Sequence, residues 1–233
     1  MQHLHASEDR ARTAADDRAA RGGEVLARHR LASGVAALAA LWLAMLLTGT
    51  GALDQRLLQL LYSADRPAMR AAVIAVTNFG EWAPLIGLTV IGALVLVYRR
   101  QPRSAILLLG ITLVGRLLVE LQKLGIGRLR PEDQVHLVPV RSLSFPSGHA
   151  GNSMIVFLSL ALLVAPRRWR RLAVPLALAA TASIGITRPM LGVHWPSDVI
   201  GGWAFGAAWV QAMLGLAERL GEEQDAAIRT GDW

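Results

Sequence analysis

Two histidines and one aspartate in the second half of the chain have a spacing suited to nucleophilic and acid–base chemistry. His194 stands four residues before Asp198, so the carboxylate can hold one imidazole nitrogen and leave the other free as a nucleophile. His149 comes at the start of an apolar run and could protonate the oxygen of a leaving group. We therefore take these three residues as the candidate catalytic group.

Three cations lie close to these residues in the sequence. Lys123 and Arg130 follow one apolar run, and Arg188 precedes His194 by six residues. Arginine binds phosphate oxygens bidentately, and lysine adds a compact point charge. Lys123 is the single lysine among 24 basic residues, which argues against an ordinary anchoring role. The three cations predict an anionic substrate.

Ser147 and Gly148 come directly before His149, where a helix is expected to begin. The free N–H groups of a helix N-terminus bind anions, and glycine allows the backbone to approach a ligand closely. Two histidines and one carboxylate among three cations are a poor site for a divalent metal, because the cations would repel it. We therefore expect phosphoryl transfer with no metal and no other cofactor, in which cationic side chains replace the usual magnesium.

The elements that must position these residues are apolar and long. Of the 233 residues 53% are apolar and 18% are charged, and the mean hydropathy is +0.40. This composition excludes a disordered chain, and the absence of cysteine excludes a disulfide scaffold. A bilayer core requires about 20 apolar residues per helix. Six runs approach that length, at 31–50, 82–98, 104–122, 150–165, 171–187 and 198–217.

These runs predict an all-α integral membrane bundle of six transmembrane helices over 31–217. It is preceded by a polar tail over 1–30 and followed by a shorter polar tail over 218–233. The segment 66–80 is too short to span, and we expect an interfacial or re-entrant helix there. Within the third run, Arg116 and Glu120 stand four apart and could pair with each other or line a substrate site.

Orientation follows from the distribution of basic residues between the runs. The two tails and the connections 99–103 and 166–170, with Arg171 adjoining, contain 15 of the 24, and the other connections contain eight. The positive-inside rule places both termini in the cytoplasm. The connections 123–149 and 188–197 then face the periplasm or exterior. All candidate site residues therefore lie at the extracytoplasmic ends of the helices of a multi-pass cell-membrane protein.

The net charge of +7 does not indicate a nucleic-acid partner. The arginines lie mostly between apolar runs and do not form a basic patch with interleaved aromatic residues. The expected partners are the bilayer and an anionic substrate, and the sequence leaves the oligomeric state open. For Arg128 and Arg141, a role as interfacial anchors is as good an explanation as a functional role. His136 is best explained as a solvated loop histidine.

The three segments together resemble a known motif. Lys-x6-Arg-Pro, then Pro-Ser-Gly-His, then Arg-x5-His-x3-Asp is similar to the three-part motif of the type 2 phosphatidic acid phosphatase superfamily. That superfamily also contains soluble bacterial acid phosphatases and vanadium haloperoxidases. The motif spans 123–198, and the six-helix plan extends the resemblance over roughly 31–217. The resemblance implies that Lys123, Arg130 and Arg188 bind the phosphate together with Ser147 and the backbone of Gly148.

The resemblance further implies a role for each of the remaining residues. His194 would attack phosphorus and form a phosphohistidine, Asp198 would orient His194, and His149 would act as the general acid. The family commonly has serine before the arginine of the third motif, where this chain has Thr187. Threonine retains the hydroxyl, so contact with the phosphate is expected to be kept.

The predicted activity is the hydrolysis of a terminal phosphate on a lipid. Undecaprenyl diphosphate, phosphatidic acid, phosphatidylglycerol phosphate and a lipid A phosphate all present that group, and the sequence does not select among them. A lipid phosphotransferase with the same site is one alternative. A non-enzymatic lipid transporter is a weaker one, because it has no necessary use for His194 and Asp198. A haloperoxidase is disfavoured because the apolar runs need lipid.

Overall fold

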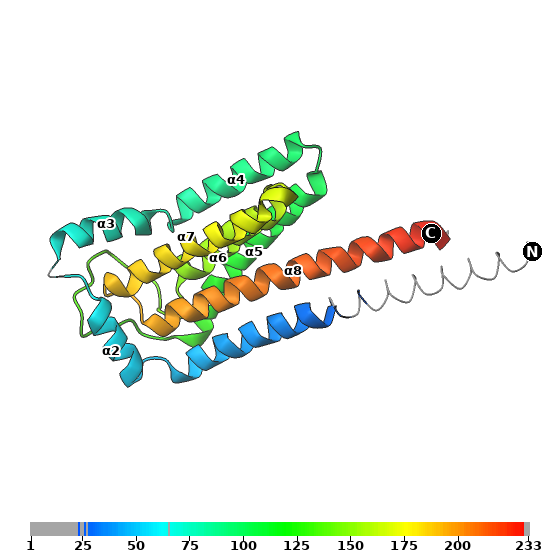
Figure 1. Cartoon of the computed structure of the whole chain (residues 1–233). Helices are drawn as coiled ribbons and strands as arrows, with labels where there is room; N and C mark the ends of the chain where they lie inside the picture. Colours follow the sequence, from blue (N-terminus) through cyan, green and yellow to red (C-terminus); the bar gives the residue numbers. More distant parts are fainter. Residues whose placement is uncertain (1–22, 24–25, 27, 65, 231–233) are drawn as a thin grey trace, which may run out of the picture.

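The computed structural model describes residues 23, 26, 28–64 and 66–230. All regular secondary structure in this part of the chain is helical, which confirms the all-α class. The predicted tail over 1–30 falls almost entirely outside the described residues. The helices, shown in Figure 1, are an N-terminal helix (Arg28–Thr48), α2 (Ala52–Leu61), α3 (Pro67–Asn78), α4 (Trp82–Tyr98), α5 (Pro102–Ile126), α6 (Gly148–Ser159), the π-helix η1 (Leu160–Val164), the 3-10 helix η2 (Arg167–Trp169), α7 (Arg170–Met190) and α8 (Pro196–Thr230).

Each of the six apolar runs is helical, but not all of these helices are long and apolar enough to cross a membrane. Among the described residues four helices qualify, at Arg28–Thr48, Pro102–Ile126, Arg167–Met190 and Pro196–Gly221. The segment predicted over 66–80 is α3, which is bent by 42° against α4, and this pair together gives a fifth candidate. The remaining run forms α6 and η1 and is shorter. Helix α8 continues through most of the predicted tail over 218–233 and ends at Thr230.

Helix α6 is the centre of the bundle. It packs against α8 most extensively, and also against α7, α5 and α4, so nearly all of its residues are buried (Figure 1). A cluster of apolar side chains from α5, α6 and α8 forms the core around it. The members of this cluster are Ile111, Val119, Met154, Ile155, Leu158 and Val210. Because α6 begins at Gly148, this core fixes the position of the predicted phosphate-binding turn.

Two glycines of α8 allow that helix to contact α6 closely. A Cβ atom at Gly202 would lie 2.8 Å from the carbonyl oxygen of Ser147, and one at Gly206 would lie 2.8 Å from that of Gly151. Small residues at such interfaces let helix backbones approach each other within a membrane. The close approach brings the start of α6 next to the start of α8.

Four helix ends meet at the end of the bundle that includes α2 and α3. They are the C-termini of α5 and α7 and the N-termini of α6 and α8 (Figure 1). Gly127 ends α5 with φ +72°, a left-handed conformation that suits glycine. The loop that follows is held by backbone bonds from Ser144 to Arg128 (2.8 Å) and from Leu137 to Leu191 (3.0 Å). The loop and the four helix ends enclose the candidate site.

Candidate active site

A polar cleft of about 210 Å³ opens at the meeting point of these helix ends. It is lined by five of the eight predicted site residues, namely Lys123, Arg130, Gly148, His149 and His194. The other three, Ser147, Arg188 and Asp198, are buried directly behind this lining. The sequence-based prediction that the three segments converge is therefore confirmed by the geometry. Glu81, Trp82, Arg116, Glu120, Ser142 and Asn152 also line the cleft.

His194 is held on one side by a carboxylate and a hydroxyl. Its Nδ1 lies 3.3 Å from Oδ2 of Asp198 and 3.3 Å from Oγ of Ser144, and the Ser144 hydroxyl itself donates to Asp198. Asp198 is fully buried, and the His194 side chain is 2% exposed. The predicted pairing at a separation of four residues is present, and Ser144 completes it.

The other ring nitrogen of His194 faces a cation. Nε2 lies 3.1 Å from a terminal nitrogen of Arg130. Because a guanidinium can donate hydrogen bonds but cannot accept them, Nε2 must be the unprotonated, accepting nitrogen. The proton then resides on Nδ1, toward Asp198. Burial lowers the pKa of His194 well below its ordinary value of 6.5, and the charges of Arg130 and Arg188 lower it further. His194 is thus neutral at pH 7, with a lone pair directed toward the cleft.

Arg128 is a second partner of the Asp198 carboxylate that the sequence did not single out. It donates to Oδ1 of Asp198 at 3.0 Å, while Oδ2 accepts from the backbone N–H of Trp195 at 2.9 Å. Arg128 also donates to the carbonyl oxygens of Met45 and Leu46 near the end of the N-terminal helix. Its side chain is only 8% exposed, so it is a buried structural cation and not an interfacial anchor.

The first two phosphate-binding candidates are oriented by one serine. Lys123 donates to Oγ of Ser142 at 3.2 Å, and Arg130 donates to the carbonyl of Ser142 at 2.7 Å. Arg130 also donates to the carbonyl oxygen of Val193. Burial lowers the pKa of Arg130, which the Asp198 carboxylate counteracts. Both cations reach the wall of the cleft beside His194.

His149 lies across the cleft between a carboxylate and a guanidinium. Its Nε2 is 3.3 Å from Oε1 of Glu81 and 3.3 Å from a terminal nitrogen of Arg188. Arg188 in turn donates to the hydroxyl of Thr77 at 2.8 Å, so α3 and α7 fix it together. Burial lowers the pKa of His149 from its ordinary value of 6.5, and the Glu81 carboxylate counteracts this by favouring the protonated imidazole that a general acid requires.

Three features of this arrangement suit an anion. The hydroxyl of Ser147 and the Nε of Arg188 are buried without a hydrogen-bond partner among the described residues. A Cβ at position 148 would lie 3.1 Å from Nζ of Lys123, so glycine keeps the space between that cation and the start of α6 open. Buried polar groups without partners are uncommon in proteins, and a bound phosphate would satisfy both.

Comparison with known proteins agrees with the site geometry. The family model of the PAP2 superfamily matches residues 104–221, which is half of the chain and includes all eight predicted site residues. The chain belongs to the PAP2 superfamily. The resemblance predicted from the three motifs is thereby confirmed.

The curated relatives of this PAP2 protein are phosphatases. Phosphatidylglycerophosphatase B of Bacillus subtilis is 29% identical over 174 residues, covering 68% of this chain and 85% of the relative. Decaprenylphosphoryl-5-phosphoribose phosphatase of Mycobacterium tuberculosis is 34% identical over 149 residues, covering 61% and 77%. The crystal structure of a transmembrane PAP2 type phosphatidylglycerolphosphate phosphatase from Bacillus subtilis is similar with a TM-score of 0.73 and 28% identity, covering 79% of this chain and 96% of that one.

Some expectations about individual PAP2-site residues need correction. Glu120 pairs with Lys123 at 3.2 Å, and it does not pair with Arg116. The Thr187 hydroxyl donates back to the carbonyl oxygen of Ile184 in its own helix, so it does not point to the cleft. The prediction for His136 holds, because this histidine is exposed and hydrogen-bonds to the carbonyl oxygen of Pro131 (2.8 Å) within the loop.

The partners that complete the PAP2 site lie far from the motifs in sequence. Glu81 and Thr77 come from the α3–α4 region, and Ser142 and Ser144 from the loop before α6. None has a distinctive spacing, although a carboxylate at position 81, between two apolar segments, was a usable signal. Among the described residues no three His, Cys, Asp or Glu side chains come together as a metal site. Catalysis without a metal stays a prediction.

Proposed function

We propose that this protein hydrolyses the terminal phosphate of a membrane lipid through a phosphohistidine at His194. The observation that supports this best is the orientation of His194, whose Nδ1 is turned to Asp198 while Nε2 faces the cations of the cleft. That orientation places the lone pair of a neutral imidazole where a phosphate would bind. The names of the two curated relatives, phosphatidylglycerophosphatase B and decaprenylphosphoryl-5-phosphoribose phosphatase, agree with it.

The first step transfers the phosphoryl group to the enzyme. Nε2 of His194 attacks phosphorus, a P–N bond forms, and the P–O bond to the lipid breaks. A proton of the protonated His149 imidazole passes to the departing oxygen, so that the lipid leaves as a neutral alcohol or, from a diphosphate, as a phosphate. Lys123, Arg130 and Arg188 neutralise the charge on the non-bridging oxygens in the transition state.

The second step returns the enzyme to its initial state. His149, now neutral, accepts a proton from a water molecule as that water attacks phosphorus. The P–N bond breaks, inorganic phosphate departs, and His194 is again neutral. Asp198 balances the positive charge on the His194 ring while it is phosphorylated.

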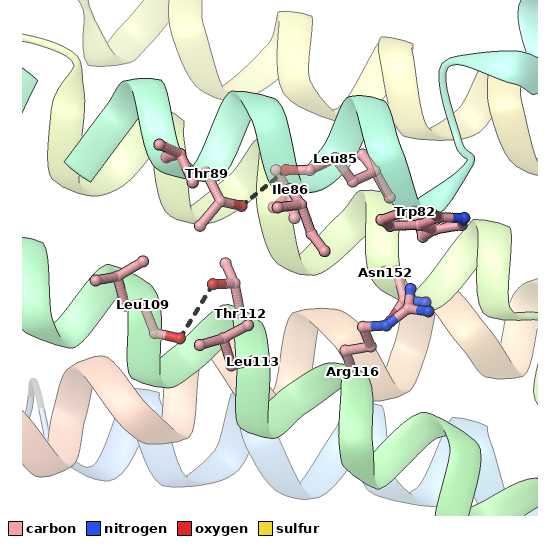
Figure 2. A pocket seen from close by; sticks show the side chains of 11 residues that line it. Trp82, Leu85, Ile86, Thr89, Leu109, Thr112, Leu113, Arg116 and Asn152 are labelled. Carbon is pink, nitrogen blue, oxygen red and sulfur yellow. Dashed lines mark hydrogen bonds between the residues drawn. The ribbon is translucent and has the colours of Figure 1, made fainter. Parts of the chain in front are cut away.

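An apolar pocket next to the polar cleft supports a lipid substrate. This pocket of about 150 Å³ lies between α4 and α5, and Figure 2 shows Leu85 and Ile86 on α4 and Leu109 and Leu113 on α5. Its two threonines, Thr89 and Thr112, donate to carbonyl oxygens of their own helices at 2.9 and 2.8 Å. Their hydroxyls are therefore satisfied, and the lining can accommodate a hydrocarbon chain (Figure 2).

The proposal is tested by phosphate release from a panel of lipid phosphates by the purified protein in detergent. We expect the wild type to release phosphate and His194→Ala to release none. His136→Ala is the matched control, because that histidine lies outside the cleft, and it should retain activity. If the wild type releases no phosphate from any of these lipids, the proposed activity is wrong.

We also propose six membrane crossings, with the active site on the extracytoplasmic face. The distribution of basic residues supports this orientation, and in Figure 1 the end of α8 lies at the opposite end of the bundle from α2 and α3. Because the chain has no cysteine, single-cysteine variants are unambiguous. His136→Cys should react with an impermeant thiol reagent in intact spheroplasts, and Arg168→Cys should not. The reverse pattern would place the site in the cytoplasm.

A further inference from the structure

The polar cleft and the apolar pocket adjoin each other, and polar side chains lie at their junction. Both are lined by Trp82, Arg116 and Asn152, which therefore mark the junction between them. Figure 2 shows Arg116 of α5 and Trp82 of α4 at the same end of the apolar pocket. If a lipid binds with its terminal phosphate in the cleft and its chains in the pocket, the part of its headgroup between the two lies at this junction.

Asn152 presents an unsatisfied acceptor at the junction. The residue is 8% exposed, and its Oδ1 is buried without a hydrogen-bond partner among the described residues. Its neighbour Ser153, by contrast, bonds to Thr181 at 2.6 Å in the helix interface. Asn152 lies one turn, about 6 Å, beyond Gly148 along α6. An uncharged donor such as a hydroxyl group would satisfy this oxygen.

Arg116 presents an unpaired cation at the same junction. It lies two turns, about 10 Å, before Lys123 on the same helix. Within the described part of the chain it has no hydrogen bond and no ion pair, because Glu120 pairs with Lys123 and Glu81 pairs with His149. An arginine within an apolar helix is costly unless it has a partner, and such residues commonly bind substrate. A guanidinium matches two oxygens of a phosphate group.

We propose that Arg116 and Asn152 form a second headgroup subsite that binds a phosphodiester and a hydroxyl. This inference rests on the proposed lipid phosphatase function. From the cleft inward, the groups are the cations around His194, then Arg116 and Asn152 together at the junction, and then the apolar lining of the pocket. A glycerolipid with the order terminal phosphate, hydroxyl-bearing glycerol, phosphodiester and acyl chains fits each position.

Other lipid phosphates use this subsite less completely. Phosphatidic acid has neither a second phosphate nor a free hydroxyl, so Arg116 and Asn152 would stay without partners when it binds. A prenyl diphosphate has two phosphates joined through one oxygen, so its second phosphate stays in the cleft beside His149 and does not reach Arg116. Arg116 thus distinguishes lipids by the presence of a second, separated negative charge.

The test compares two substrates with the same acyl chains in the same detergent micelles. For the wild type, Arg116→Gln and Arg116→Lys, kcat/KM is measured with phosphatidylglycerol phosphate and with phosphatidic acid. We expect Arg116→Gln to lower the ratio of the two values about 10- to 100-fold, the effect of one charge-assisted contact, and Arg116→Lys to restore part of it. Arg103→Gln, at the other end of the same helix, is the matched control and should leave the ratio unchanged.

Asn152 is tested with an analogue of phosphatidylglycerol phosphate that lacks the free glycerol hydroxyl. The wild type should lose several-fold in kcat/KM on this analogue, whereas Asn152→Leu should treat both compounds alike. The ratio is internal to each preparation, so partial misfolding of a variant does not affect it. An unchanged ratio in Arg116→Gln, or an equal loss on both lipids, overturns the second subsite. Failure of the wild type to hydrolyse either lipid would instead refute the phosphatase activity itself.

Discussion

Replacement of Arg128 by methionine should both destabilise the protein and slow catalysis, although Arg128 does not line the cleft. The guanidinium contacts Oδ1 of Asp198 at 3.0 Å, and no other side chain among the described residues contacts that oxygen. Both groups are almost fully buried. Arg128→Met would therefore leave a buried carboxylate oxygen without its partner and the carbonyl oxygens of Met45 and Leu46 without their donor.

The size of the effect follows from these contacts. Removal of one partner of a buried ion pair costs about 3–5 kcal/mol, because the other charge is left uncompensated. The reaction rate should fall about 10- to 100-fold, because Asp198 orients His194 and a hydrogen bond to a charged group contributes about 1.5–3 kcal/mol. Arg128→Lys keeps the charge but cannot reach all of the acceptors, so an intermediate loss is expected.

The assay combines thermal unfolding in detergent with kcat on p-nitrophenyl phosphate. Arg56→Met, an exposed arginine on α2, is the control and should match the wild type in both measurements. The double variant Arg128→Met/Asp198→Asn should regain part of the lost stability, since the unpaired charge is removed, but none of the lost activity. If Arg128→Met unfolds at the wild-type temperature, or the double variant is less stable than either single one, the buried pair does not act as described.

Three further predictions concern the metal, the protonation of His194 and the contact between α6 and α8. Hydrolysis should persist in excess EDTA and be inhibited by vanadate, and restoration by magnesium after loss in EDTA would refute the mechanism. Because burial and nearby cations lower the pKa of His194, its neutral form should persist below pH 6.5 in an NMR titration of the imidazole nitrogens, and a midpoint at or above 6.5 would contradict this. Gly202→Ala places a Cβ 2.8 Å from a backbone oxygen and should cost about 1–3 kcal/mol of stability, whereas Gly110→Ala in α5, with open space around it, should cost none.

The sequence was sufficient for the residues whose spacing reflects local geometry. A separation of four residues brings His194 to Asp198 because the carboxylate lies in the first turn of α8, and this pairing depends on no distant contact. The apolar runs likewise predicted where the helices lie. The end of α8 was less predictable, because polar residues after the apolar run continue the same helix to Thr230.

Residues that act through tertiary contacts could not be predicted in this way. Arg128 resembles any basic residue at the end of a membrane helix, and only the packing of the N-terminal helix and α8 around it gives it a buried carboxylate partner. Arg116 and Glu120 have the spacing of a helical ion pair. Lys123 is also within reach of Glu120, however, and it is Lys123 that pairs with this carboxylate. Arg116 is therefore left without an ion pair at the junction of the two pockets, among the described residues. Competition among several possible partners is decided by three-dimensional packing, which spacing alone does not specify.

The assignment of His194 as nucleophile and His149 as general acid is tested most directly by the activity of two variants on two substrates. A general acid contributes about 10²–10⁴-fold when the leaving group is a poor one such as a lipid alkoxide, and much less for p-nitrophenolate. We therefore predict that His149→Ala loses far more activity on a lipid phosphate than on p-nitrophenyl phosphate, whereas His194→Ala is inactive on both. Equal losses in the two variants on both substrates would contradict the assignment and leave both histidines as phosphate-binding groups only.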